Sequence, residues 1–294
     1  MNETESGAPR KNRAPLCMAA AALCFSLGGM LIKLVPWPSM AISCARSVLA
    51  GAILLFYMKL RGHRIVVNPA VLLGGSAMGA TSILFVISAK LTTAANAILL
   101  QYTAPVFIIF FMWIFFHVRP TKLDVAATVV LLCGVVLFFA NSLSGGGGTM
   151  TGNLTALISG VTWAGVFMMK QWDGADNLSS VFFGCVLCAV TGAPWMFSPA
   201  VSWTLPALAG IVVIGVVQFG AAYVFMAEGL EGTPPLTASL ISMLEPVLNP
   251  VWAALAVGEK LGGLSLAGAA VVVVGVLGYN LLKARAEQKR KTAA

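Results

Sequence analysis

Charged residues are scarce in this sequence. Asp, Glu, Lys and Arg make up only 10% of its 294 residues, whereas 59% are hydrophobic. Soluble globular domains carry about 25% charged residues. The mean hydropathy is +0.92, and no stretch has the composition of a soluble domain. The composition therefore excludes a soluble protein and predicts an all-α integral membrane protein that contacts the lipid bilayer.

Histidine and metal-binding patterns are also lacking. The two histidines, His63 and His117, lie far apart with no carboxylate at ligand spacing. Cys185 and Cys188 form a CxxC pair, but it lies inside an apolar stretch with no second pair and is typical of small packing residues. No P-loop is present. We therefore expect no metal site, no cofactor and no use of ATP.

Apolar stretches dominate what is present, and a helix needs about 20 apolar residues to cross a bilayer. Ten stretches meet this length: 15–35, 39–58, 70–89, 95–116, 123–141, 152–171, 178–197, 205–227, 234–257 and 264–282. The sequence thus predicts a tail (1–14), a five-helix repeat (15–141), a Gly-rich linker (142–151), a second five-helix repeat (152–282) and a basic tail (283–294).

Lys and Arg gather on alternate loops of this topology. If the N-terminus is cytoplasmic, both tails and most basic loops lie inside, and only Lys33, Lys90 and Lys260 lie outside. This positive-inside pattern accounts for the net charge of +8 without a nucleic-acid partner. It predicts a multi-pass protein of the bacterial inner membrane with both termini in the cytoplasm.

The two groups of five helices are related in sequence. Aligning Pro105 with Pro246 also aligns Gly134 with Gly275, with no gap between them. Five is an odd number, so the second repeat must be inverted in the membrane relative to the first. Inverted repeats are typical of secondary transporters, whose substrate sites lie near the midplane at the repeat interface.

The segment 237–261 combines a charge with helix-breaking residues. Glu245 lies near its middle, where a carboxyl costs roughly 3 kcal/mol on insertion scales. Pro246 and Pro250 each remove a helical hydrogen bond, and irregular backbone at membrane depth is tolerated where it lines a polar cavity. We therefore expect a binding site here, with hinges at Pro246, Pro250 and the first-half counterpart Pro105.

Glu245 has three expected roles: proton carrier, partner of a cationic substrate group, or structural ion-pair partner of Arg46. The other candidate residues of the cavity are Ser242, Asn249, Gln101, Tyr102, Gln218, Trp163, Ser26 and Thr81. An interhelical hydrogen bond is an equal alternative for Ser242 and Asn249, and packing is the commoner role for Trp163. Tyr223 is a further candidate, about 140° from Gln218 around an ideal helix.

Three segments resemble the EamA branch of the drug/metabolite transporter superfamily. LTASLISMLEPVLNPVWAALAVGEKLGGLSLAGAAVVVVGVLG resembles its last two helices, with an ALxxLEPV-like turn, a GE[KR]L and a Gly-rich final helix. TTAANAILLQYTAPVFIIFF resembles the first-half counterpart, and ISCARSVLAGAIL resembles the second helix, with Arg46 at its usual place. The resemblance covers nearly the whole chain and departs at HVRPT (117–121). It implies that helices 1, 3, 4, 6, 8 and 9 line a central cavity.

Together these features predict a secondary active transporter that works by alternating access, as a monomer or homodimer, with protons as a candidate coupling ion. The resemblance implies export of small metabolites such as amino acids or related compounds. A membrane-embedded enzyme acting on lipid-like substrates would need a catalytic or metal cluster, which the sequence lacks. A non-transporting sensor would need a soluble domain, and the inverted repeat favours a carrier over a channel.

Overall fold

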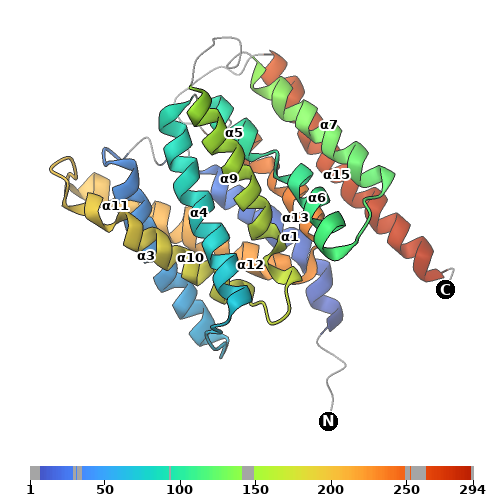
Figure 1. Cartoon of the computed structure of the whole chain (residues 1–294), viewed down its shortest axis with the longest axis horizontal. Coiled ribbons are helices and arrows are strands. Elements are labelled where there is room, and N and C mark those ends of the chain that lie inside the picture. The colour runs from blue at the N-terminus through green and yellow to red at the C-terminus, as the bar shows by residue number, and fades with distance from the viewer. Residues whose placement is uncertain are drawn as a thin grey trace.

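The computed structural model describes residues 7–28, 31, 35–92, 94–140, 149–248, 252 and 263–292. This part of the chain forms helices and contains no strand (Figure 1). The helices of the first half are α1 (Gly7–Ser26), α3 (Ser39–Leu60), α4 (Pro69–Leu91), α5 (Ala94–Gln101), α6 (Ala104–Phe116) and α7 (Lys122–Phe138). Those of the second half are α9 (Met150–Met168), η1 (Met169–Gln171), α10 (Asn177–Gly192), η2 (Ala193–Phe197), α11 (Leu205–Val213), η3 (Ile214–Ala221), α12 (Ala222–Gly232), α13 (Pro235–Ser242) and α15 (Gly263–Thr292).

Each of the ten segments expected from the sequence overlaps at least one of these helices. Within the described residues, 7 helical segments are long and apolar enough to cross a membrane. They are Ser39–Leu60, Pro69–Ser88, Asn96–Phe116, Met150–Gln171, Asn177–Phe197, Leu205–Gly232 and Gly263–Ala286. Two apolar helices, Arg13–Ser26 and Pro235–Leu248, are shorter. Ten spans and their division into two repeats therefore stay a prediction.

Polar side chains fix where several helices begin. Asn68 accepts a hydrogen bond from the Val71 N–H at the start of α4, and Thr149 caps α9 in the same way. Thr121 and Asp124 form a reciprocal capping box at the start of α7. Such caps satisfy N–H groups that the first helical turn leaves unpaired.

The helices of the two halves pack against one another in matching pairs. α4 packs on α9 and α12 packs on α1; α10 packs on α4 and η3 packs on α3; α5 packs on α9 and α13 packs on α1. In addition, α3 contacts α10, α6 contacts α13, and α7 contacts α15. α7 and α15 lie side by side along one edge of the molecule, away from α3, α10 and α11 (Figure 1).

A hydrogen-bonded carboxylate joins α7 to α15. Asp124 Oδ1 accepts hydrogen bonds from the Tyr279 hydroxyl at 2.8 Å and from Lys283 Nζ at 2.6 Å. Its other oxygen accepts the Thr121 N–H at 2.9 Å. Every hydrogen bond of this carboxylate comes from a donor, which favours its ionised form and ties the start of α7 to the C-terminal half of α15.

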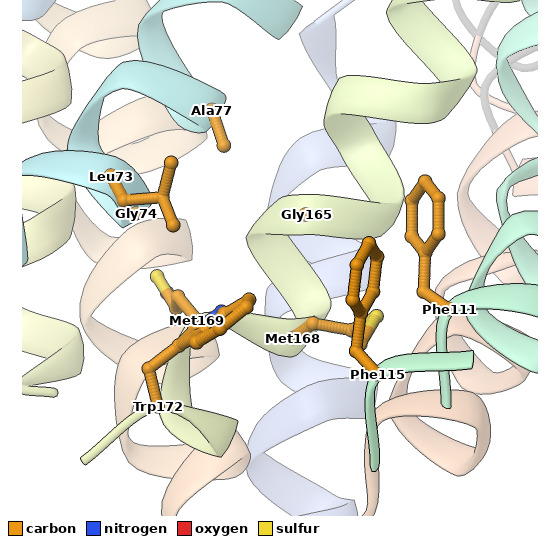
Figure 2. A pocket seen from close by; sticks show the side chains of 9 residues that line it. All are labelled: Leu73, Gly74, Ala77, Phe111, Phe115, Gly165, Met168, Met169 and Trp172. Atoms are coloured by element: carbon orange, nitrogen blue, oxygen red, sulfur yellow. The ribbon is translucent and has the colours of Figure 1, made fainter. Parts of the chain in front are cut away.

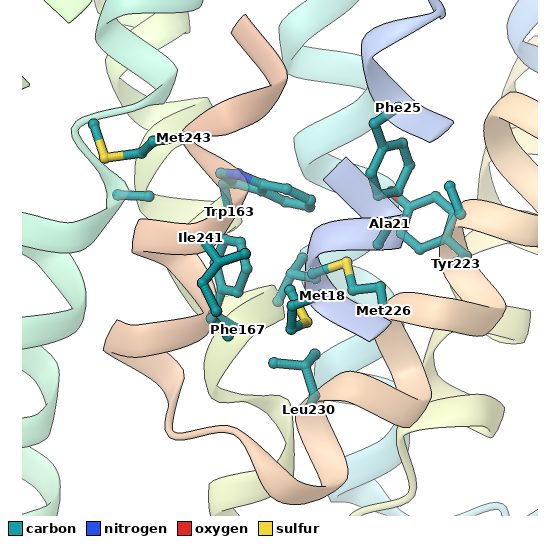
Figure 3. Close-up of a cluster of buried hydrophobic side chains, with 14 of the residues drawn as sticks. Met18, Ala21, Phe25, Trp163, Phe167, Tyr223, Met226, Leu230, Ile241 and Met243 are labelled. Atoms are coloured by element: carbon teal, nitrogen blue, oxygen red, sulfur yellow. The ribbon is translucent and has the colours of Figure 1, made fainter. Parts of the chain in front are cut away.

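The apolar core lies between α1, α9, α12 and α13. Met18, Phe167, Met226, Leu230 and Ile241 meet there, each at most 4% exposed (Figure 3). Beside this cluster, a small apolar space bordered by α1, α9, α12 and Ser242 has no room for a water molecule. The molecule is therefore densely packed on this side of its centre.

Candidate functional site

The two proline-containing helices are interrupted where the sequence predicts. α5 ends at Gln101, two turn residues follow, and α6 begins with Pro105 in its first turn. α13 ends at Ser242, Met243 forms a turn, and helix resumes through Pro246 to residue 248. Each interruption lies within one turn before a proline. The proline has no N–H, so it cannot donate the helical hydrogen bond to a carbonyl of the preceding turn. A break in a helix allows the chain to bend there, and the hinge role of these prolines stays a prediction.

The two interruptions meet through one hydrogen bond. The Tyr102 hydroxyl donates to Glu245 Oε2 at 2.7 Å, between residues 143 positions apart in the chain. Tyr102 is 4% exposed, whereas Glu245 is only partly buried. A hydrogen bond to an ionised carboxylate is short and strong. The pair therefore fixes the two broken helices to each other while part of Glu245 remains accessible.

Close packing against α9 holds the first interruption in place. A Cβ added at Gly160 would lie 2.8 Å from the Leu100 carbonyl oxygen and 3.0 Å from that of Gln101. The backbone oxygens at the end of α5 thus contact α9 where only a glycine leaves room. Gln101 is partly buried at this point, so its backbone is a defined part of the site.

Arg46 does not form the expected ion pair with Glu245. Its Nη2 donates to Ser82 Oγ at 3.0 Å, and its Cζ lies 4.2 Å from the centre of the Phe219 ring. Within the part of the chain that the structure describes, no carboxylate lies at ion-pair distance from the Arg46 guanidinium. The structural-pair role for Glu245 is therefore not seen, because Tyr102 occupies the carboxylate and α3 directs Arg46 toward α4 and η3.

Aromatic rings packed edge-to-face link the centre of the molecule to the apolar core. Phe25 packs edge-on to Tyr223 at 4.9 Å and to Trp163 at 6.5 Å, and Trp163 packs edge-on to Phe167 at 4.8 Å between ring centres (Figure 3). Trp163 is 6% exposed and packs within this cluster, and its contact with a substrate stays a prediction.

A π-helix changes the relation between Gln218 and Tyr223. Both residues are about 140° apart on an ideal α-helix, but η3 is a π-helix that contains Gln218. Because π-helical hydrogen bonds join residues i and i+5, this winding draws Tyr223 toward the face that carries Gln218. Gln218 is 5% exposed, and among the residues that the structure describes its Oε1 has no hydrogen-bond partner. A Cβ at Gly28 would lie only 2.9 Å from Gln218 Nε2, so the Gln218 side chain reaches the backbone just after α1.

The EamA-like transporter family model matches residues 12–140 and, separately, residues 150–281. The chain belongs to the EamA-like transporter family. This EamA-like transporter is 27% identical over 290 residues to the "uncharacterized transporter YwfM" of Bacillus subtilis, with 95% of this chain and 96% of the relative covered. It is 25% identical over 262 residues to the "uncharacterized inner membrane transporter YedA" of Escherichia coli, with 82% and 79% covered.

A crystal structure of another protein has the same fold. It superposes with a TM-score of 0.80 at 21% identity, and the match covers 94% of this chain and 99% of that chain. Family membership, the relatives' names and the apolar helices together make the chain a multi-pass membrane transporter.

The remaining candidate residues of this EamA-like transporter divide between the centre and the helix interfaces. Ser26 accepts a hydrogen bond from Trp252 Nε1 at 2.8 Å, a contact that the sequence gave no reason to expect. Thr81 Oγ1 contacts Thr162 Oγ1 at 2.8 Å and so joins α4 to α9. Ser242 donates to the Ser239 carbonyl within α13 at 2.7 Å. Asn249 and Pro250 lie outside the described residues.

A cavity lies apart from Glu245 (Figure 2). It has a volume of about 150 Å³ and lies between α4, α6 and α9. Its lining consists of Leu73, Gly74, Ala77, Phe111, Phe115, Gly165, Met168, Met169 and Trp172. An apolar lining gives water no hydrogen-bonding partners, and none of the predicted site residues borders it. This cavity suits an apolar group and supplies no charge for recognition.

Proposed function

We propose that this EamA-like transporter is a secondary active exporter of small metabolites, such as amino acids or related compounds, that works by alternating access. The observation that carries the proposal is the hydrogen bond between Tyr102 and Glu245 at 2.7 Å. It joins two interrupted helices from opposite halves of the chain at Glu245, a residue of intermediate burial. Interrupted helices that meet at the repeat interface are typical of transporter substrate sites.

The proposal includes ten spans in two inverted five-helix repeats, with both termini in the cytoplasm of a bacterial cell. Two features support the repeats. The same family model matches each half separately. The helix contacts also correspond between the halves. If each helix is replaced by its counterpart in the other half, the contact of α4 with α9 becomes that of α12 with α1, α10 with α4 becomes η3 with α3, and α5 with α9 becomes α13 with α1. A two-fold axis in the membrane plane would produce this correspondence.

In this mechanism the interruptions near Pro105 and Pro246 act as hinges while the halves rock about the centre. The apolar cluster around Met18, Phe167 and Met226 keeps one side closed in the present state. With both termini inside, this is the cytoplasmic side. Glu245 exchanges its Tyr102 contact for a proton or for a cationic group of the substrate when the cavity is loaded, because either species satisfies a buried carboxylate.

Substitution of Glu245 tests the proposal against a matched control. Glu228 accepts a hydrogen bond from the Tyr57 hydroxyl at 3.0 Å, the same chemical contact at a different place. Glu245→Gln and Glu228→Gln would be reconstituted in proteoliposomes with a substrate identified by counterflow. If Glu245 carries protons, Glu245→Gln abolishes transport driven by a pH gradient and leaves exchange partly intact. If it contacts the substrate, driven transport and exchange fall together by at least tenfold.

The control variant Glu228→Gln is expected to transport at close to the wild-type rate in both assays. Folded Glu245→Gln protein that performs both driven transport and exchange normally would refute a role for this carboxyl. Loss of folding in Glu245→Gln alone would instead assign the Tyr102–Glu245 contact to structure rather than to transport.

A further inference from the structure

Arg46 is a buried cation with almost no hydrogen-bonding partner. It is 8% exposed, and within the described residues its one side-chain hydrogen bond is the 3.0 Å contact with the neutral Ser82 hydroxyl. Its Nε has no acceptor. Arginine keeps its proton under all ordinary conditions, so the charge itself must be stabilised. The Phe219 ring covers one face of the guanidinium at 4.2 Å, which contributes far less than an anion would.

The neighbours of Arg46 on α3 are unsatisfied in the same way. Ser43 lies about one helical turn before both Arg46 and Ser47, so the three residues fall within an arc of about 100° on α3. Both serines are nearly inaccessible, at 2% and 1%, and within the described residues neither hydroxyl makes a well-formed hydrogen bond, although that of Ser47 lies beside the Cys188 thiol. Buried polar groups are almost always paired. Two buried hydroxyls on the same helix as a guanidinium whose Nε has no acceptor among the described residues are therefore unusual for a site that serves packing alone.

The chemistry of these groups selects the ligand. Arg46 Nε can only donate, and the free hydroxyls of Ser43 and Ser47 can donate as well. A set of donors around a guanidinium fits a small anion, above all a carboxylate, which accepts two parallel hydrogen bonds from the fork of an arginine. The site lies between α3, α4 and η3, the element that also carries Gln218 with its unpaired Oε1.

We propose that Arg46, with Ser43, Ser47 and Ser82, binds a small monovalent anion. The anion is either a carboxylate carried by the transported molecule or a resident inorganic ion, and both sources offer the same acceptor chemistry. Arg46 lies over the Phe219 ring, which packs edge-on to Tyr223 at 4.7 Å between ring centres. The anion site thus borders the aromatic cluster at the centre of the molecule. Anion binding at Arg46 does not depend on the proposed transport function. Only the assignment of the anion to a substrate carboxylate rests on that function.

Thermal unfolding of the purified full-length protein in detergent tests the site without a transport assay. Sodium HEPES, whose sulfonate is bulky, would be replaced stepwise by sodium chloride or sodium acetate at constant ionic strength. We expect a saturable rise in the unfolding temperature of the wild type, roughly 5 °C at a hundred times the dissociation constant. Arg46→Met should show no rise with either salt.

The behaviour of Arg46→Met without a bound anion separates a ligand site from a structural role. Replacing an uncompensated buried charge by a hydrophobic side chain of similar size is often neutral or stabilising. In HEPES alone we therefore expect Arg46→Met to unfold at or above the wild-type temperature. If Arg46 serves only to hold Ser82 and Phe219, Arg46→Met unfolds at a lower temperature in every buffer and the proposal fails.

Two further variants keep the test decisive if Arg46→Met does not fold. Arg46→Lys retains the charge but loses the fork, and Ser47→Ala removes one donor, so each should raise the half-saturating anion concentration several-fold. Ser159→Ala is the matched control, because Ser159 on α9 is likewise fully buried with an unpartnered hydroxyl. It should titrate like the wild type.

The two salts also identify the source of the anion. A rise with acetate alone assigns the site to a carboxylate group, a rise with chloride alone assigns it to a resident inorganic ion, and a rise with both supports a general anion site. No rise with either salt, or equal rises in wild type and Arg46→Met, overturns the proposal. An Arg46-dependent rise in a protein that fails every transport assay would preserve the anion site and reject the proposed function.

Discussion

Gly160→Ala tests the packing that positions the first helix interruption. The added methyl group would lie 2.8 Å from the Leu100 carbonyl oxygen and 3.0 Å from that of Gln101, distances that real Cβ atoms do not or seldom show. Both are backbone atoms, so no side-chain rotation relieves the contact and the end of α5 must move away from α9. Overpacking of this kind costs about 1–3 kcal/mol, and about 1 kcal/mol is returned by the better helix propensity of alanine.

We therefore expect Gly160→Ala to lower the free energy of unfolding by about 1 kcal/mol and to reduce transport more strongly, because Tyr102 follows directly after Gln101. The assays are thermal unfolding in detergent and counterflow in proteoliposomes. Gly278→Ala is the control, since a Cβ there meets nothing within 4 Å, and it should be neutral or slightly stabilising. If Gly160→Ala is as stable and active as Gly278→Ala, the reasoning about this contact is wrong.

Two further predictions concern polar groups near the helix ends. Asp124→Asn removes the charge that holds Tyr279 and Lys283, and should lower the free energy of unfolding by about 2 kcal/mol. Lys170→Met breaks the more exposed pair with Glu231, and should cost less than about 1 kcal/mol. Equal losses in denaturant titrations would contradict this ranking. Burial raises the pKa of Asp176, but hydrogen bonds from Ser179 and the contact with His63 outweigh it and lower the pKa below its ordinary value. Asp176 therefore stabilises the fold above the pKa that it has in the unfolded chain, and this contribution is lost as the pH falls through its folded pKa. The stability difference between wild type and Asp176→Asn should thus be full at pH 7 and shrink below about pH 4, and a difference independent of pH would refute the assignment.

The sequence was most informative where covalent structure decides the outcome. A proline lacks an N–H wherever it lies, so the interruptions before Pro105 and Pro246 could be predicted without knowing how the helices pack. The contact between Tyr102 and Glu245 could not be predicted as a pair, because it joins positions 143 apart and depends on the packing of one half against the other.

Other contacts of the candidate residues also depend on the fold. Residue spacing assumed α-helical winding between Gln218 and Tyr223, whereas Gln218 lies in a π-helix. Thr81 bonds to Thr162 on a neighbouring helix, as hydroxyls in apolar helices readily do, and its place at the cavity stays a prediction. An ion pair with Arg46 was one of three roles expected for Glu245, whereas the helices direct Arg46 to Ser82 and Glu245 to Tyr102.

The measurement that tests the central claim most directly is counterflow in proteoliposomes. Purified wild-type protein would be loaded with unlabelled amino acids, amines, nucleosides or organic acids, and uptake of the labelled counterpart would be followed. The account predicts that one chemical class accumulates transiently above its equilibrium level, which requires a carrier that exchanges its substrate across the membrane. No accumulation in any class by folded protein would contradict the proposal that this family member exports small metabolites.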